Sequence, residues 1–189
     1  MIAHKISNFE NLLPATQSEL ATQTMKDPYV FDFIPFKEDM VERDIENALV
    51  REVTSLLLEL GTGFAFLGNQ YHLTVGGDDF YIDLLFYHRG LSCLVAFELK
   101  IGEFKPEYVG KINLYLEALD REVKKDNENP SVGVILCASK DDEVVEFALS
   151  RSLSPTMVSE YNLKLIDKKL LQKKLKEYIE LAGTVSEEE

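Results

Sequence analysis

Residues 80–100 read FYIDLLFYHRGLSCLVAFELK, and this stretch decides the fold. Two almost continuously apolar runs, at 80–87 and 91–99, lie on either side of Arg89 and Gly90, a pair typical of a hairpin turn. Apolar runs without polar alternation are typical of strands that are covered on both faces of a sheet. The sequence therefore predicts a central hairpin packed between layers of helices.

Periodicity and turn residues predict the elements around this hairpin. They are a helix over 42–60, a strand near 64–75, a helix over 106–123, a strand over 131–137, a helix over 141–149, a short strand over 158–161 and a lysine-rich helix near 167–182. This order predicts an α/β fold in which helices flank a mixed central β-sheet on both faces.

The first 40 residues differ from the rest by weak periodicity and by three prolines. We expect residues 1–40 to form an N-terminal arm or linker, whose aromatic segment DPYVFDFIPF (27–36) packs on another surface. One main domain is expected over 41–183, followed by an acidic tail over 184–189.

The chain is acidic, with 33 Asp and Glu against 20 Lys and Arg among its 189 residues and a formal net charge of −13. This balance argues against a protein that coats nucleic acid by bulk charge, but not against a local site where acids hold a metal. A basic stretch at 164–176 fits a solvated helix face. Cys93 and Cys137 lie in apolar runs and are expected to be buried free thiols. With no signal segment and no run long enough to cross a membrane, a cytoplasmic protein is expected.

Three charged residues stand out in the central hairpin. Asp83 interrupts the first apolar run, and Glu98 and Lys100 end the second. A buried carboxylate needs a cation, a hydrogen-bond donor or a metal. Glu98 and Lys100 point to one face of a strand, because the side-chain period is two. Beside Asp83 they would form a cluster in which carboxylates hold Mg²⁺ and the lysine orients an attacking water. A structural ion pair is the alternative.

Other polar side chains could support this cluster. Tyr108, Lys111 and Tyr115 share one face of a predicted helix and are candidates for contact with phosphate or bases. A packing face with a lysine at its edge is the alternative. Gln70 lies on the polar side of a predicted strand. Glu46, on the first long helix, could reach the cluster as a further carboxylate or remain solvated.

The chain carries a resemblance to a known family. The block GFAFLGNQYHLTVGGDDFYIDLLFYHRGLSCLVAFELKIGEFKPEYVGKINLYLEALD at 63–120 resembles the YhcG-type nucleases of the PDDEXK superfamily. The pieces QSELATQTMKDPYVFDF at 17–33 and ENPSVGVILCASKDDEVVEFAL at 128–149 are also similar to that family. The resemblance covers about residues 15–165.

The resemblance implies a restriction-endonuclease-like core and metal-dependent cleavage of DNA phosphodiesters. It matches Asp83 to the aspartate of the motif and Glu98 and Lys100 to its Glu-x-Lys. We expect Asp83, Glu98, the carbonyl of Leu99 and Glu46 to hold Mg²⁺ or Mn²⁺. Lys100 is expected to position the water.

The resemblance extends to the following helix. Lys111 and Tyr115 resemble the Gln-x-x-x-Tyr helix of RecB-like nucleases, with lysine in place of glutamine. Together with Tyr108 and Gln70, they are expected to bind DNA or to support the site. Members of the family usually carry a further N-terminal domain, so we expect that substrate recognition resides partly outside these 189 residues.

Three hypotheses follow for the function. The first is a metal-dependent DNA nuclease with a role in DNA repair, recombination or defence, acting as a homodimer if it makes double-strand breaks. The second is a catalytically silent nuclease-fold module that binds DNA or assembles with a protein partner. The third is a structural relic in which the charged cluster is only an ion pair.

Overall fold

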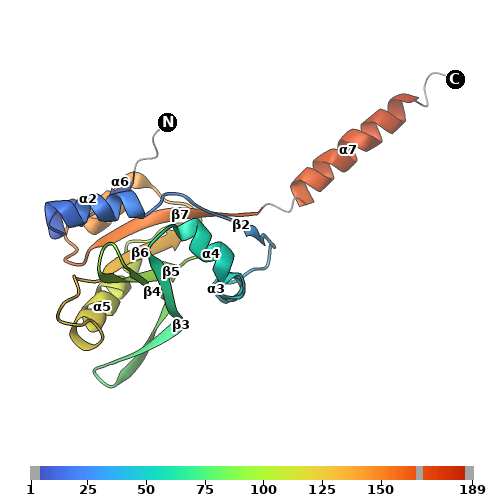
Figure 1. Cartoon of the computed structure of the whole chain (residues 1–189). Helices are drawn as coiled ribbons and strands as arrows, with labels where there is room; N and C mark the ends of the chain where they lie inside the picture. The colour runs from blue at the N-terminus through green and yellow to red at the C-terminus, as the bar shows by residue number, and fades with distance from the viewer. Residues whose placement is uncertain (1–4, 165–167, 186–189) are drawn as a thin grey trace.

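The computed structural model describes residues 5–164 and 168–185 (Figure 1). Its sheet has the strand order β1-β7-β6-β5-β4-β3, with β2 paired to β7. The strands are β1 (Ile6–Ser7), β2 (Tyr29–Pro35), β3 (Phe64–Val75), β4 (Asp78–His88), β5 (Cys93–Leu99), β6 (Val132–Cys137) and β7 (Thr156–Lys164). Strand β5 is antiparallel to β4 and parallel to β6, which confirms the predicted mixed sheet.

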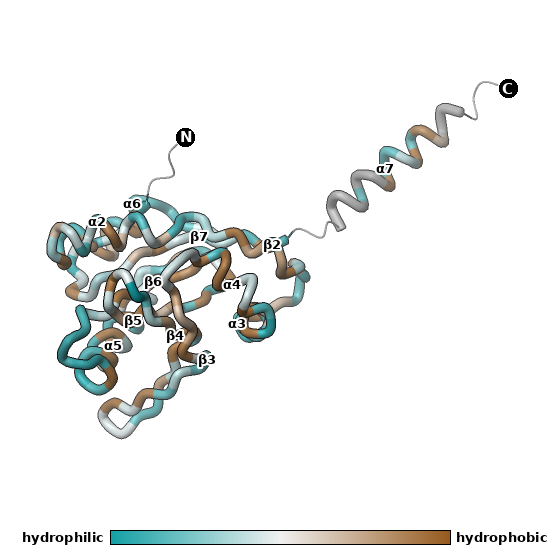
Figure 2. The backbone as a smooth tube through the Cα atoms, in the orientation of Figure 1, coloured by the Kyte–Doolittle hydropathy of each residue, from teal (hydrophilic) through white to brown (hydrophobic). Residues whose placement is uncertain are grey.

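Helices cover both faces of this sheet, as the sequence predicts. The helices of the body are α1 (Phe9–Leu12), α2 (Ala15–Thr24), α3 (Glu42–Arg51), α4 (Val53–Leu60), α5 (Glu107–Glu122) and α6 (Asp142–Leu149), and α7 (Lys168–Val185) lies apart from the sheet in Figure 1. One buried cluster joins the sheet to α2, α3 and α4, and another joins it to α5 and α6. Figure 2 shows the hydrophobic residues along the strands at the centre of the body.

The predicted central hairpin is confirmed. Strands β4 and β5 pair from Leu84 with Phe97 to His88 with Cys93. Every residue of β5 is buried, because its side chains meet helices on both faces of the sheet. Both cysteines are buried and free, and burial raises the pKa of each thiol to about 12.

The N-terminal segment differs from the expected arm or linker. Strands β1 and β2 pair with successive parts of β7, at Val158 and from Tyr161 onward. Phe9, Tyr29 and Phe31 are fully buried. The aromatic segment therefore packs as expected, but residues 6–35 belong to the sheet and its core. Their pattern is hard to recognise, because short edge strands need neither long apolar runs nor a helical period.

Two helices differ from their predicted form. The single helix expected over 42–60 divides at Glu52, where the backbone leaves the helical region at ψ 39°. Both halves bury leucines in one cluster, among them Leu49 and Leu56. The lysine-rich helix is present as α7, which points away from the body in Figure 1. Residue 167 of the predicted range lies outside the described residues. In the described ranges, no helix has the length and apolar character that a membrane crossing requires.

Two side chains of helix α5 pack directly against Gly133 of β6. A methyl group added at Gly133 would lie 2.7 Å from Cγ1 of Ile112 and 3.1 Å from Cδ1 of Leu116. We therefore expect Gly133→Ala to lower the free energy of unfolding by about 1–3 kcal/mol, as overpacking does. Gly110→Ala is the matched control, because its methyl group would meet no atom within 4 Å. The control should raise stability by about 0.5–1 kcal/mol in urea denaturation. Equal effects of the two substitutions would contradict this packing.

Candidate active site

Two carboxylates hold the ends of β4 and β5 together. The backbone pairing of these strands ends at Leu84 and Phe97. Beyond it, the N–H of Leu99 donates to Oδ2 of Asp83 at 2.8 Å. In return, the N–H of Asp83 donates to Oε1 of Glu98 at 3.2 Å. Each carboxylate thus takes a backbone donor from the opposite strand, and the two acids lie side by side where the strands part.

Glu98 is a buried acid with one oxygen lacking a donor. Its residue is 3% exposed, and Oε2 has no hydrogen-bond partner. Nζ of Lys111 lies 4.0 Å from that oxygen. The pKa of Glu98 is raised to about 8: burial is the largest cause, the neighbouring Asp83 acts in the same direction, and Lys111 opposes both. A buried acceptor in this state favours a proton or a bound cation.

Glu46 is joined to Asp83 through an amide. The side chain of Gln70 donates from Nε2 to Oε2 of Glu46 at 2.7 Å and to Oδ1 of Asp83 at 3.2 Å. Asn69 donates to the other oxygen of Glu46 at 3.2 Å. Burial raises the pKa of Glu46, whereas the two amides lower it. Gln70 therefore links α3 to β4 across the site.

Two irregularities of β3 lie beside these two amides. The register of β3 against β4 shifts between Phe66 and Gly68 as a β-bulge, and Gln70 itself has a left-handed backbone with a φ of +46°. Neighbouring residues of a regular strand point to opposite faces, but the left-handed Gln70 interrupts that alternation. Asn69 and Gln70 therefore both reach Glu46. Glycine within a strand pattern is the sequence signal that could have predicted this bulge.

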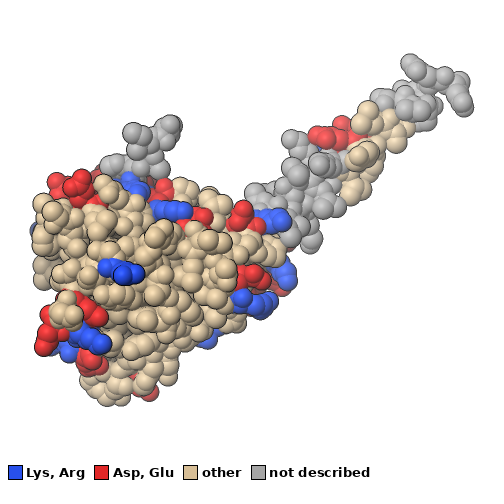
Figure 3. Space-filling model, viewed as in Figure 1, with Lys and Arg blue, Asp and Glu red and all other residues tan. Residues whose placement is uncertain are grey.

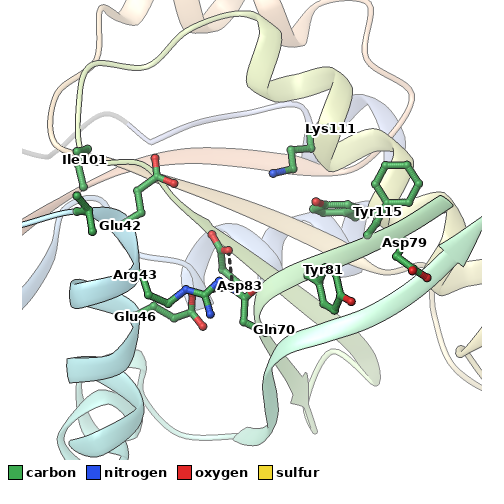
Figure 4. A pocket seen from close by; sticks show the side chains of 12 residues that line it. Glu42, Arg43, Glu46, Gln70, Asp79, Tyr81, Asp83, Ile101, Lys111 and Tyr115 are labelled. Carbon is green, nitrogen blue, oxygen red and sulfur yellow. Dashed lines mark hydrogen bonds between the residues drawn. The ribbon is translucent and has the colours of Figure 1, made fainter.

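An open pocket of about 610 Å³ lies over Asp83. Its lining comes from α3, β3, β4, the segment after β5, and α5, and comprises Val41, Glu42, Arg43, Glu46, Gln70, Asp79, Phe80, Tyr81, Asp83, Ile101, Lys111 and Tyr115. Figure 4 shows Arg43 and Lys111 reaching into the space around Asp83 from different helices. The pocket therefore combines the carboxylate of Asp83 with two cationic side chains, Arg43 and Lys111, and further acids, Glu42, Glu46 and Asp79, in its lining.

Lys100 has other neighbours than the carboxylate pair. Its Nζ lies 3.9 Å from Oε2 of Glu42 and 4.8 Å from the ring centroid of Tyr108. Lys111, from α5, instead places its Nζ 4.0 Å from Oε2 of Glu98. The strand alternation that predicts Glu98 and Lys100 on one face is less informative here, because β5 ends at Leu99. Leu99 meets Asp83 through its N–H, and the proposed role of its carbonyl stays a prediction.

Tyr115 lies within the wall of the pocket. It is 2% exposed, its hydroxyl is hydrogen-bonded to the backbone of Tyr81, and its ring lies 6.3 Å from that of Phe80. Nζ of Lys111 lies 5.6 Å from the centroid of the same ring. This geometry suits a residue that supports Lys111 and β4, whereas direct contact with DNA would need a more open ring.

The site also contains residues that sequence reasoning did not select. Glu42 pairs with Lys100, Arg43 lines the pocket, and Asn69 binds Glu46. Glu42 lies one helical turn before Glu46, which is a weak signal for a shared face. No sequence signal distinguishes Arg43 from other surface arginines.

The acidic residues do not form a compact trio. Among the residues that the structure describes, no group of three or more His, Cys, Asp and Glu side chains is arranged to hold a metal ion. The amide of Gln70 lies between Glu46 and Asp83. Asp83 and the unpartnered oxygen of Glu98 are the pair that could accept a cation, with water completing its oxygen ligands.

The sheet, its helical layers and the carboxylate pair define an α/β fold of the PDDEXK nuclease class. The family model of the YhcG PDDEXK nuclease domain matches residues 22–176, so the chain belongs to this family. The chain is 35% identical over 176 residues to the protein of Escherichia coli (strain K12) named "Putative nuclease YhcG". That match covers 93% of the chain and 47% of the relative, so the chain spans about half the relative's length.

Solved structures resemble the chain more distantly. A repair endonuclease from Pyrococcus abyssi matches with 17% identity and a TM-score of 0.42, covering 67% of this chain and 49% of its own. The EndoMS protein in its complex with double-stranded DNA matches with 17% identity and a TM-score of 0.44, covering 68% and 46%. Both similarities are weak and concern the fold alone.

The raised pKa of Glu98 predicts a pH dependence of stability. In the metal-free protein, folded Glu98 keeps its proton up to a pH of about 8, whereas the unfolded chain loses it near 4.5. The contribution of Glu98 to the free energy of unfolding is therefore fully present below pH 4.5. It is lost as the pH rises from 4.5 to about 8, by at most about 1.4 kcal/mol per pH unit. Glu98→Gln should remove this loss. Urea denaturation in EDTA at several pH values measures it, and parallel stability curves for the two proteins would refute the assignment.

Proposed function

We propose that the chain is a divalent-metal-dependent nuclease that hydrolyses phosphodiester bonds of DNA. The observation that carries the proposal is the buried Oε2 of Glu98, which has no donor and lies beside Asp83, itself in the lining of a pocket that Arg43 and Lys111 also line. Membership of the YhcG PDDEXK nuclease-domain family supports the same activity.

Asp83 and Glu98 are the residues that would hold Mg²⁺ or Mn²⁺, since carboxylate oxygens suit both ions. A bound ion would supply Lewis-acid chemistry, lowering the pKa of a water and offsetting charge on the phosphoryl group. Glu46 fits an outer carboxylate, because both its oxygens already accept amide donors. The carbonyl of Leu99 is a further candidate ligand.

The other side chains of the site would bind the phosphate, position water or hold their neighbours in place. Lys111 and Arg43 line the pocket and would bind the non-bridging oxygens of the scissile phosphate. Lys100 is fixed between Glu42 and the ring of Tyr108, so it can hold a water in one orientation. Tyr115 would hold Lys111 in place through its ring. Gln70 would keep Glu46 and Asp83 at a fixed separation.

Cleavage assays test the activity directly. Plasmid and linear DNA are incubated with the full chain in Mg²⁺ or Mn²⁺, and we expect cleavage that EDTA abolishes. Asp83→Asn should reduce the rate by at least about 100-fold, because it removes a charged ligand while keeping the side-chain shape. Asp126→Asn is the matched control, because Asp126 is exposed outside the pocket and the substitution removes the same charge.

Equal cleavage rates for the wild-type chain and the Asp83→Asn variant would overturn the proposal. DNA retention without cleavage in either metal would favour the catalytically silent binding module instead.

Metal affinity gives a second test, independent of turnover. Because burial keeps Glu98 protonated up to a pH of about 8, a metal must displace that proton. We expect calorimetric titration with MnCl₂ to show tighter binding at pH 8 than at pH 6.5, with proton release at the lower pH. Glu98→Gln should weaken binding at both pH values and flatten the dependence. Undiminished binding by this variant would exclude Glu98 as a ligand.

A further inference from the structure

The hairpin of β3 and β4 extends beyond the sheet as a two-stranded ribbon (Figure 1). Strand β4 pairs with β3 along its whole length, but with β5 only from Leu84 to His88. One face of the ribbon packs toward α5 and buries Leu73 and Ile82. Because this face is packed, the side chains on the other face of the ribbon are held in fixed positions.

The outer face of the ribbon presents an ordered aromatic ring. His72 lies opposite Tyr81 in the ladder, and their ring centroids are 5.2 Å apart at an interplanar angle of 33°. His72 is held in turn by Oδ1 of Asp79 at 2.7 Å, and Thr74 donates to the same oxygen at 3.3 Å. Tyr81 itself remains 47% exposed. The ring is therefore backed on one side and open on the other.

This ring lies next to the candidate catalytic carboxylates. Asp79, Tyr81 and Asp83 alternate along one face of β4, and all three line the same pocket. Two residues of a strand span roughly 7 Å. A nucleotide adjoining a phosphate at Asp83 therefore comes within reach of Tyr81. Figure 4 shows Tyr81 between Asp83 and Asp79 on the ribbon.

The charges around the pocket separate a phosphate side from a base side. Residues 69–83 contain no lysine or arginine, and Asp78 and Asp79 stand near the ribbon tip. The cations of the pocket, Arg43 and Lys111, come from α3 and α5. A backbone phosphate is attracted to these two side chains, although Glu42 and Glu46 of α3 also line the pocket, whereas the ribbon offers an aromatic face to a base. Inside a duplex both faces of a base are covered by its neighbours, so the open face of Tyr81 can stack only on a base outside the duplex stack.

We propose that Tyr81 stacks on an unpaired nucleobase next to the scissile phosphate, so that the substrate is DNA with a single-stranded segment. Aromatic stacking of this kind tolerates any base, since every base has a π-face. The proposal rests on the proposed nuclease function for the term "substrate", but the binding surface can be tested without cleavage.

The test is binding of a single-stranded oligonucleotide that contains 2-aminopurine, compared with the matching duplex, in EDTA and at a stated low salt concentration. We expect the full chain to bind the single strand more tightly and to quench its fluorescence. Tyr81→Ala should weaken single-strand binding by about 5- to 150-fold and abolish the quenching. Tyr81→Phe should retain both, because it keeps the ring.

Tyr178→Ala is the matched control, since Tyr178 is 73% exposed on α7 and should leave single-strand binding unchanged. Thermal unfolding of each variant verifies that the fold persists. Unchanged binding by Tyr81→Ala, or an equal loss for single strand and duplex, would overturn the inference. If the chain cleaves DNA but Tyr81→Ala changes nothing, only the stacking fails. If it cleaves nothing but Tyr81→Ala still loses single-strand binding, the surface stands and the nuclease function fails.

Discussion

Two hydrogen bonds are the constraint on which the candidate site depends: the N–H of Leu99 donates to the carboxylate of Asp83, and the N–H of Asp83 donates to the carboxylate of Glu98. Strands β4 and β5 part at this point, so the N–H groups of Asp83 and Leu99 have no partner in the ladder. A buried N–H needs an acceptor. The carboxylates supply those acceptors, so the same pair that could hold a metal also closes the end of the β4–β5 ladder. The arrangement fixes one oxygen of Glu98 and leaves the other without a donor. The chemistry of the site therefore follows from how the hairpin ends.

The net charge of −13 opposes the binding of DNA, which the proposed function requires. The charges at the pocket differ from this average. On the face seen in Figure 3, most charged side chains lie toward the rim, one basic group stands within the otherwise uncharged area, and no broad basic surface is seen. Positive charge is instead placed at the pocket, by Arg43 and Lys111. A bound divalent ion would add to it and reverse the local sign at the carboxylates of Asp83 and Glu98. Affinity for DNA should accordingly rise when a divalent ion is bound and fall with increasing salt, rather than follow bulk charge.

Much of the fold and part of the site follow from local sequence. The uninterrupted apolar run of β5 predicts burial on both faces, and Asp83 and Glu98 stand out because they break such runs. The direction of the Gln70 side chain depends on a left-handed backbone just after a β-bulge, and a simple period-two count represents neither feature. The neighbours of Lys100 depend on how the chain turns after β5 ends. The pairing of β1 and β2 with β7 joins segments more than 120 residues apart, and local patterns carry little information about such contacts.

The central claim is that Asp83 and Glu98 together hold a divalent metal. Anomalous diffraction from crystals of the chain soaked in Mn²⁺ tests this most directly, because it locates the ion without assuming activity. We predict a peak within coordinating distance of Oε2 of Glu98 and a carboxylate oxygen of Asp83, lost in crystals of Glu98→Gln. A well-ordered site with no peak between these two carboxylates, or an equal peak in the variant, would contradict the account.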